Sequence, residues 1–477
     1  MSYIDSEIDL NEIHFSPLST VDIGRVFEFK NRLFRAISCK ESESVVEMFS
    51  CGMIDELESK KLFPKSWITK YKLDGYGLII EHERIPSKNF PYEWSFSMFK
   101  DAAIALLEVN IIASKYGYQT KDCHAYNVMF DGCLPMFVDL GSFVKTYNSH
   151  SKWNCYNKFL QYYYYILKIW GRGNSYLARA IVQSDNTDIY SPPRSSELYG
   201  LYRKDNSFLI LVDKSKQIVS RLYFRLYNLL IKRGFSPFLF SLTKEKFYSF
   251  PSLLRKLEKI PAPWVSSISN DDESSLKGDS SIQSSPNFNK IIDLVNHLNI
   301  ETVTNIGWHQ DVFSKILLQG TNVQKIVCID HDVNAVEQLY LSSKNIEGVR
   351  ERITPVSLNS IYPNVSCFTH SEELLPYSEG RFKSDVVVAL DLTNHLLIFE
   401  KYSIDWVFNM LSRYSKRYAL IEFVPFDFCL EKGKPSPLSS QYTSDWFRDA
   451  FSKYFRIILE EKLENDRIIF CGELLTI

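Results

Sequence analysis

The sequence lacks a strong excess of either charge, a paired-cysteine motif and any apolar run long enough to cross a bilayer. Its 477 residues carry 55 Lys and Arg against 57 Asp and Glu, so the molecule has no strong field to attract nucleic acid or an anionic membrane. The longest apolar and aromatic stretch, residues 159–170, is too short for a membrane span. These absences favour small molecules or proteins as partners.

Nine cysteines are scattered along the chain and never form a C-x-x-C pair. Their odd number and spacing favour reduced thiols over a disulfide framework or a zinc site. The first residues, MSYIDSEIDLNEI, are acidic and show no basic segment followed by an apolar run, so no secretory leader is expected. We therefore expect a cytoplasmic protein.

Hydrophobic residues are plentiful, at 45% with 14% aromatic, so the chain can bury a large core and should divide into two or three domains. The clearest break lies near residues 264–286, where Ser, Asn, Asp and Gly dominate. The sequence therefore predicts an N-terminal region, a helical extension, a Ser-rich linker and a C-terminal domain, at residues 1–149, 150–262, 263–287 and 288–477.

Strand-like and helix-like runs alternate after the linker, from TVTNIG and DVFSKILLQG to YALIEFVP. This alternation predicts an α/β fold with a parallel sheet and helices on both faces. The chain then ends with two β-rich runs, RIILEEKLE and DRIIFCGEL, around a short turn. A terminal hairpin added to a parallel sheet is typical of the methyltransferase version of the Rossmann-like fold.

The first two strands of that fold carry the contacts to S-adenosylmethionine. A glycine-rich turn ends the first strand, and here it is NIGWHQD, in which Gly307 is kept, Asn305 replaces an acid and Asp311 replaces a glycine. The second strand ends at Asp330, where an acid ordinarily receives the ribose hydroxyls of the cofactor. An Asp before a helix can equally cap that helix, so both interpretations of Asp330 stay open.

Later strands deliver polar residues to the carboxyl edge of the sheet, where ligands of open α/β sheets bind. The fourth strand brings Asp391, Asn394 and His395 there. We assign Asp391 to the cofactor and His395 to the role of base for a hydroxyl or amine acceptor. A merely hydrogen-bonded histidine is the alternative. Glu422, in the fifth strand, has apolar neighbours that would raise its pKa, unless it is a satisfied structural acid.

The N-terminal region reads as α+β. GRVFEF and RLFRAIS predict two antiparallel strands, GYGLIIEHERIP predicts a third, and residues 98–116 predict a helix that ends before Gly117. A loop and a hairpin follow in KDCHAYNVMFDG and LPMFVDLGSF.

This loop and hairpin contain D-x-x-x-x-N followed by D-L-G, the arrangement of kinase-like phosphotransferases. Asp122 would orient or deprotonate a hydroxyl acceptor, while Asn127 and Asp139 would hold the magnesium ions that bridge the phosphates of ATP. No G-x-G-x-x-G loop lies near Gly24, and Arg35 is the nearest cation to replace the strand lysine. A kinase-derived lobe kept for architecture is the alternative.

Six blocks stand out in order along the chain: GRVFEF, EHERIPSKNFPYEWSFSMFKDAA, KDCHAYNVMFDGCLPMFVDLGSF, SSELYGLY, IVCIDHDVNAVEQLY and IEFVP. Together they resemble bacterial class I S-adenosylmethionine-dependent methyltransferases with an N-terminal kinase-like region, some of them labelled nodulation methyltransferases. The resemblance covers nearly the whole chain. It implies a Rossmann-like methyltransferase domain and S-adenosylmethionine as cofactor.

The chain departs from this family at three points of the expected pocket. Family members usually have D-L-G-C-N-T-G where this chain has NIGWHQD, an acid where it has Ser357, and a histidine pair where it has Asn394 and His395. Either the methyl donor binds in an altered way or the domain has stopped binding it.

Three functions follow from these patterns. The first is a methyltransferase acting on a small molecule or glycoconjugate. The second is a phosphotransferase, or a nucleotide-binding pseudokinase, whose C-terminal domain is a docking platform for a protein partner. The third is a non-catalytic scaffold built from two retired enzyme folds. We expect the first.

Overall fold

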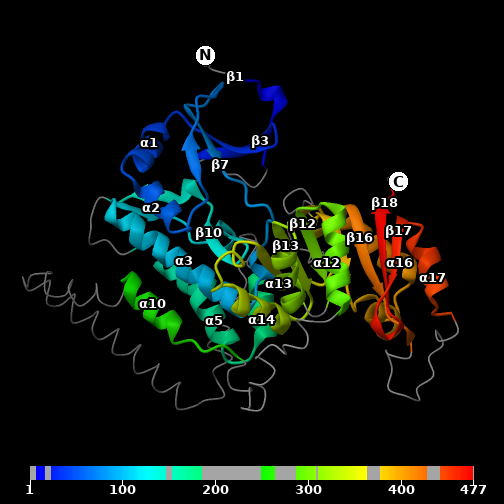
Figure 1. The fold of residues 1–477 in the computed structure, drawn as a ribbon. Coiled ribbons are helices and arrows are strands. Elements are labelled where there is room, and N and C mark those ends of the chain that lie inside the picture. The colour runs from blue at the N-terminus through cyan, green and yellow to red at the C-terminus, as the bar shows by residue number, and fades with distance from the viewer. Residues whose placement is uncertain are drawn as a thin grey trace, which may run out of the picture.

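The computed structural model describes residues 7–16, 23–146, 153–184, 249–263, 286–307, 310–361, 377–426 and 441–475. An N-terminal α+β region lies beside a C-terminal open sheet, and the two meet where α3 (Phe96–Lys115) packs against α14 (Val333–Ser343) (Figure 1). Almost all of the predicted linker, and residues 185–248 of the predicted helical extension, lie outside the described residues.

The N-terminal sheet has five strands in the order β2-β3-β4-β7-β5, and every neighbouring pair is antiparallel. Alternation of side chains sends Phe34 and Ala36 to one apolar cluster and Ile37 to the core shared with α3, so Arg35 lies on the α3-facing side of the sheet. The strands are β2 (His14–Phe15), β3 (Gly24–Phe29), β4 (Arg32–Ile37), β5 (Ser66–Ile68) and β7 (Leu78–His82), and three of them confirm the predicted strands.

Helix α3 confirms the predicted helix to within two residues at its start. Its apolar stripe is fully buried, and the helix stops before Gly117, which adopts a left-handed φ of +80°. The stripe consists of Phe99, Ala102, Ala103, Leu106 and Leu107. The smaller elements around it are β1 (Glu7–Ile8), β6 (Lys72–Leu73), α1 (Ser42–Ser50) and α2 (Met53–Ser59).

Two small antiparallel pairs follow α3 and carry the two predicted motifs. Strand β8 (Tyr118–Thr120) pairs with β11 (Phe143–Lys145), and β9 (Val128–Asp131) pairs with β10 (Leu134–Phe137). The D-x-x-x-x-N loop therefore joins the two pairs at one point and the D-L-G turn joins them at another. The described parts of the predicted helical extension are helical, as α4 (Tyr156–Phe159), α5 (Tyr165–Trp170), α6 (Ser175–Ser184) and α10 (Phe250–Glu258).

The C-terminal sheet has seven strands in the order β14-β13-β12-β15-β16-β18-β17. All are parallel except β18, which is antiparallel to both neighbours, as the predicted terminal hairpin requires. The strands are β12 (Thr302–Ile306), β13 (Lys325–Asp330), β14 (Ile353–Ser357), β15 (Ser384–Ala389), β16 (Ser415–Phe423), β17 (Phe455–Lys462) and β18 (Ile468–Leu474).

Helices cover both faces of this sheet, because alternate strand residues enter different cores. Val386 and Val388 pack in one cluster with residues of α12 and α13, while Val387 and Ala389 pack in another with residues of α16 and α17. The α/β fold predicted for residues 288–477 is therefore confirmed. These helices are α12 (Pro286–Leu298), α13 (Gln310–Gly320), α16 (Ile404–Arg413) and α17 (Ser444–Phe451).

The two regions share a hydrophobic core. Val336 and Tyr340 of α14 belong to the same buried cluster as the residues of α3. The Tyr340 hydroxyl and Lys344 Nζ both donate to Asp101, at 2.8 and 2.6 Å, and Glu337 accepts from the backbone N–H of Ser97 at 2.9 Å. Helix α14 thus completes the N-terminal core.

A buried ion pair forms a second contact between the regions. Arg381, in α15 (Ser378–Phe382), donates to Glu93 through both terminal nitrogens, and the side chains are 4% and 0% exposed. Its guanidinium also donates to the Lys88 carbonyl at 2.6 Å and lies 4.5 Å from the ring centre of Phe90. The connector between β7 and α3 is therefore bound to the C-terminal domain.

The turn of the β9–β10 hairpin makes a third contact. Gly132 has a φ of +64°, and a Cβ there would lie 2.2 Å from the Arg350 carbonyl oxygen, so only glycine fits. Beside it the Cys133 N–H donates to the same oxygen at 2.6 Å, and Asp131 pairs with Lys325 at 2.6 Å. The hairpin that follows the D-x-x-x-x-N loop is thus bonded to the first residue of β13.

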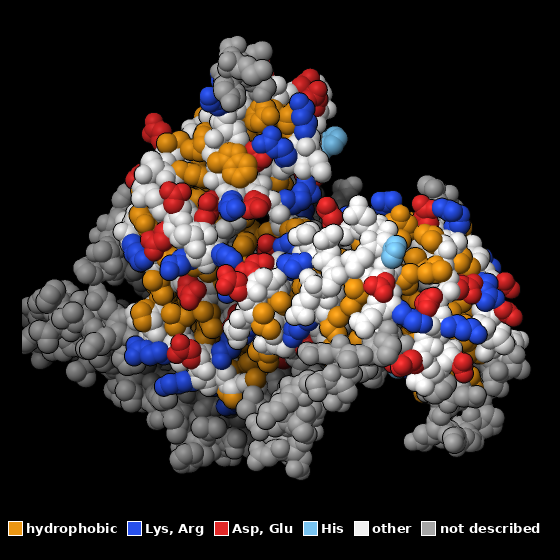
Figure 2. Space-filling view, in the orientation of Figure 1, with side chains coloured by type: hydrophobic (Ala, Val, Ile, Leu, Met, Phe, Trp, Pro, Cys, Tyr) orange, Lys and Arg blue, Asp and Glu red, His pale blue; other side chains and the backbone are white. Residues whose placement is uncertain are grey.

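The described cysteines are free thiols, as predicted, and two more, at 367 and 429, lie outside the described residues. On the face shown in Figure 2, acidic and basic side chains are interspersed. No helix within the described ranges is both long and apolar enough to cross a membrane.

Candidate functional site

The carboxyl edge of the seven-stranded sheet gathers the predicted cofactor residues. Because β12, β13 and β15 are parallel neighbours, the residues that follow them, Gly307, Asp330 and Asp391, lie along one edge. Gly307 has a φ of +128°, and a Cβ there would lie 2.9 Å from the Leu390 carbonyl oxygen. The glycine is needed because the turn after β12 passes directly against the end of β15.

Both replaced positions of the turn, Asn305 and Asp311, lie among the described residues, but two residues between them do not. Trp308 and His309 lie outside the described residues. Asp311, predicted to place a charge in the turn, accepts from the Ser342 hydroxyl at 2.8 Å and pairs with Lys315 at 2.5 Å. Its carboxylate is therefore paired with a lysine of its own helix, α13, and hydrogen-bonded to a serine of α14.

Asp330 ends β13 with its side chain only 11% exposed. One carboxylate oxygen accepts from the Asp332 N–H at 2.8 Å, and Asp332 in turn caps α14 by accepting from the Asn334 N–H at 2.9 Å. The N-cap of α14 is thus Asp332, and Asp330 accepts a hydrogen bond from the backbone of that capping residue. Burial raises the pKa of the Asp330 carboxyl.

The turn after β15 is held by a buried acid from the next strand. Asp391 has a left-handed φ of +54°, which is unusual for a residue with a side chain, and its N–H donates to Glu422 Oε2 at 2.9 Å. Arg467 donates to the other Glu422 oxygen at 3.1 Å. Burial raises the pKa of Glu422 while Arg467 opposes the shift, so both predicted features of this acid, desolvation and satisfaction, are present.

His395 follows this turn and begins a π-helix, His395–Phe399, a rare element that is frequent at functional sites. Its side chain is 29% exposed, and its Nε2 lies 3.6 Å from a Glu400 carboxylate oxygen. Its ring lies 6.5 Å from that of His331, the neighbour of Asp330. The structure therefore brings the predicted cofactor acid and the predicted base to one edge, and His331 contacts both of them.

The N-terminal motifs also come together. Asn127 Nδ2 donates to Asp122 Oδ2 at 3.2 Å, and the Asn127 carbonyl accepts from the N–H of Val138, the residue before Asp139. Arg35 Nη1 lies 3.7 Å from Asp139 Oδ1, so the arginine of β4 forms an ion pair with the acid of the D-L-G turn. Burial raises the pKa of Asp139, and Arg35 lowers it in part.

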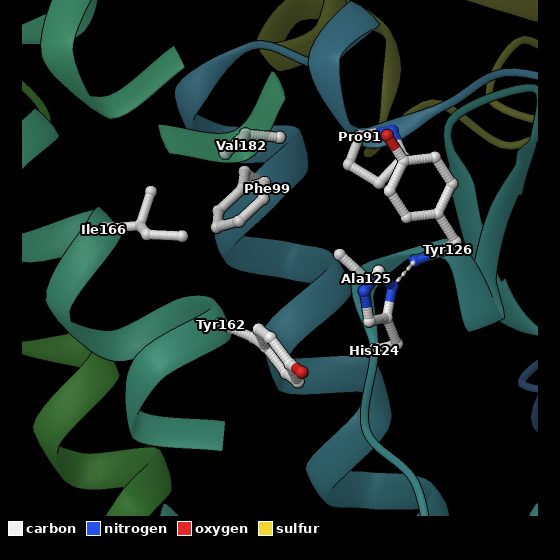
Figure 3. Close-up of a pocket in the computed structure, with 8 residues that line it drawn as sticks. All are labelled: Pro91, Phe99, His124, Ala125, Tyr126, Tyr162, Ile166 and Val182. Carbon is white, nitrogen blue, oxygen red and sulfur yellow. Dashed lines mark hydrogen bonds between the residues drawn. The ribbon is translucent and has the colours of Figure 1, made fainter. Parts of the chain in front are cut away.

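No three His, Cys, Asp or Glu side chains of the described ranges gather in a way that would hold a metal ion. An ion held by Asn127 and Asp139 would therefore need phosphate oxygens among its ligands. A nearby cavity offers no alternative site. It has a volume of about 10 Å³, the room of one water molecule, and lies between the loop residues His124, Ala125 and Tyr126 and apolar helix residues (Figure 3).

Sequence reasoning did not identify His82, a buried histidine at the end of β7 that lies near Arg35. Its Nδ1 is 2.7 Å from the Ser66 hydroxyl, and its Nε2 is buried with no hydrogen-bond partner in the described residues. Burial, aided by the Arg35 charge, lowers the pKa of His82 to about 3. Nothing in a strand sequence distinguishes such a histidine from an ordinary edge residue.

This histidine predicts acid sensitivity. The unfolded chain takes up a proton below about pH 6.5 whereas folded His82 does not until about pH 3, so stability falls as the pH drops from 6.5. Between pH 7 and 5 this group should remove about 2 kcal/mol from the unfolding free energy. Urea unfolding at both pH values measures this loss, and in His82→Gln the fall in unfolding free energy from pH 7 to pH 5 should be smaller by that amount. An equal fall in the two proteins would contradict the assignment.

No family model matches the chain. Among curated proteins it is similar to nodulation protein NoeA of Rhizobium meliloti (strain 1021), with 22% identity over 461 residues that cover 91% of this chain and 90% of NoeA.

Solved structures similar to the chain include the N-methyltransferase NodS from Bradyrhizobium japonicum WM9, with 8% identity and a TM-score of 0.30 over 40% of this chain and 95% of NodS. Magnesium protoporphyrin IX methyltransferase from Synechocystis PCC 6803 with bound SAM gives 14% identity and a TM-score of 0.29 over 41% of this chain and 82% of that one. At such TM-scores the fold assignment depends on the sheet order itself. The resemblance to nodulation proteins that the six sequence blocks predict is confirmed, since NoeA matches this chain along nearly its whole length.

Proposed function

We propose that the C-terminal domain binds S-adenosylmethionine at the carboxyl edge of its sheet and methylates a small-molecule acceptor, with a glycoconjugate as one such class. The observation that carries the proposal is the convergence of Gly307, Asp330 and His395 on that edge, where ligands of open α/β sheets bind.

Two features support a fit to the cofactor. Asp330 is largely buried, yet only one of its oxygens is used to support the α14 cap, so the carboxylate retains capacity for hydroxyl donors. Ser357, its register partner on β14, has a buried hydroxyl without a partner in the described residues. A ribose would satisfy both groups.

In this proposal each residue has a separate task. Gly307 lets the backbone approach the amino-acid part of the cofactor, Asp330 accepts the ribose hydroxyls, and Asp391 orders the turn that faces both ligands. S-adenosylmethionine would supply an electrophilic methyl group, whose bond to the sulfonium sulfur breaks so that neutral S-adenosylhomocysteine is the leaving group. His395 takes the proton that the acceptor nitrogen or oxygen releases as its bond to the methyl carbon forms.

Calorimetric titration of the full chain with S-adenosylmethionine and S-adenosylhomocysteine tests the proposal. Saturable heat in the micromolar range is expected from both. Absence of heat, together with an unchanged melting temperature at millimolar ligand, would retire it.

A second candidate function is magnesium-nucleotide binding at the loop and turn that carry Asp122, Asn127 and Asp139. It is favoured by one observation, the ion pair between Arg35 and Asp139 beside the bonded pair Asp122 and Asn127. In this arrangement Arg35 would grip a phosphate, while Asn127 and Asp139 would share a magnesium ion with the phosphate oxygens. The N-terminal region would then bind the ligand of a kinase, magnesium with a nucleotide, in addition to carrying a kinase-like motif.

Asp139→Asn should weaken Mg-ATP binding by about tenfold or more, because the variant loses a charged magnesium ligand. Calorimetry with ATP, with and without magnesium, measures the effect, and Asp74→Asn, at an exposed acid outside this loop and turn, is the matched control. Equal binding by the two variants, or no binding by the parent protein at millimolar nucleotide, would contradict nucleotide binding and leave the region with a structural role only.

A further inference from the structure

Three aromatic rings form a row along the carboxyl edge of the C-terminal sheet. The His331 and His395 rings are 6.5 Å apart and inclined by 21°, and the His395 and Phe399 rings are 5.5 Å apart and inclined by 29°. The row thus runs from the residue after Asp330 to the end of the π-helix. Its last member, Phe399, is 51% exposed, which is high for a large apolar side chain.

A fixed amide stands at the start of this π-helix. Asn394 Nδ2 donates to Asp391 Oδ1 at 3.0 Å, and this bond sets the orientation of the side chain. Asn394 Oδ1 is buried and finds no donor among the residues that the structure describes. A buried acceptor without a donor is costly, so an N–H or O–H brought by a ligand would complete the site.

Three carboxylates of the described residues, Asp391, Glu400 and Glu422, lie close to these groups. Arg467 lies 3.1 Å from Glu422 and 3.8 Å from Asp391, so one guanidinium serves two acids. Glu400 adds a third carboxylate 3.6 Å from His395. A negatively charged ligand would meet repulsion here, whereas a neutral or positively charged one would not.

We propose that the ring row and Asn394 form the acceptor subsite, and that the acceptor is a ring-bearing amine or alcohol without a negative charge. The inference rests on the proposed methyltransferase function, because it names the acceptor of the same domain. The acceptor ring lies against the exposed Phe399, its N–H or O–H donates to Asn394 Oδ1, and His395 stands beside that group to take the proton.

The test uses three small probes of one ring: benzylamine, benzyl alcohol and benzoate. Each is titrated into the full-length protein by saturation-transfer NMR, with S-adenosylhomocysteine binding measured separately on the same samples. Benzylamine and benzyl alcohol should bind at millimolar concentration, and benzoate should bind at least about tenfold more weakly. Phe399→Ala should weaken the two bound probes by about tenfold, and Asn394→Leu should do the same.

Trp67→Ala is the matched control, because Trp67 is an aromatic residue of similar exposure, 44%, on the N-terminal sheet. It should leave probe binding unchanged. The inference would be overturned if benzoate bound as well as benzylamine, or if Phe399→Ala left binding of benzylamine unchanged. The proposed function would still stand in that case, provided that S-adenosylhomocysteine bound. If S-adenosylhomocysteine itself fails to bind, the proposed function falls and the acceptor assignment with it.

Discussion

Replacing Arg381 by alanine should lower the free energy of unfolding by about 3–5 kcal/mol. The substitution leaves the fully buried Glu93 carboxylate with one remaining donor of the described contacts, the Phe90 N–H at 2.8 Å. It also removes the donor to the Lys88 carbonyl. Because this pair joins the two regions, urea unfolding followed by both circular dichroism and tryptophan fluorescence should show whether the loss affects them together.

Two further variants separate the ion pair from general effects. Arg413→Ala removes an exposed arginine that lies 3.7 Å from Glu379, and it should cost no more than about 1 kcal/mol. The double variant Glu93→Met with Arg381→Met should regain most of the stability, because a buried pair replaced by apolar groups leaves no isolated charge. A loss in Arg381→Ala as small as that in Arg413→Ala would contradict the role assigned to the pair.

Asp330→Asn should weaken S-adenosylmethionine binding by about a hundredfold, the largest functional effect that we expect. The variant keeps an oxygen to accept the Asp332 N–H, so the cap of α14 survives. It loses the negative charge, and hydrogen bonds from two ribose hydroxyls to a charged acceptor are worth about 1.5–3 kcal/mol each. Calorimetry at neutral pH measures the change.

The neighbouring acid provides the control. Asp332→Ala removes the cap itself and should lower stability by about 1 kcal/mol without changing affinity for the cofactor. Since burial raises the pKa of Asp330, binding by the parent protein should also weaken as the pH falls through that raised pKa, whereas binding by Asp330→Asn should not. Equal affinities of Asp330→Asn and the parent protein would remove Asp330 from the cofactor site.

The elements of both regions could be predicted because their patterns are local. Alternating or continuous apolar runs specified β12, β13 and β15, and a single stripe with a terminal glycine specified α3. The open sheet then followed from the order of strands and helices. The N-terminal strands were predicted as well, although the kinase-like character of that region stays a proposal.

The contacts between the regions could not be predicted. Glu93 and Arg381 are separated by 288 positions, and no local property of either residue indicates the other. The same holds for Gly132, whose need arises only because the Arg350 backbone lies against it. Such pairings depend on how the two regions dock, which the patterns of separate segments do not encode.

The candidate site was predicted in its members but not in its geometry. The sequence placed Asp330, Asp391 and His395 at strand ends, and the structure lays them along one edge. It gave no sign of Arg467, which reaches the edge only because the terminal hairpin folds back antiparallel to β16. Long-range pairing of this kind also fixes the left-handed turn at Asp391 through Glu422.

The core shared through Val336 and Tyr340 has a consequence for synthesis of the chain. Among the described residues the last buried N-terminal member of that core is Ile260, and roughly 80 residues must be added before Tyr340 is made. At about 5–20 residues per second, the nascent N-terminal region waits on the order of 4–16 s with an apolar surface uncovered. During that interval its folding depends on residues that the ribosome has yet to supply, so a pause or truncation after residue 263 leaves an aggregation-prone fragment.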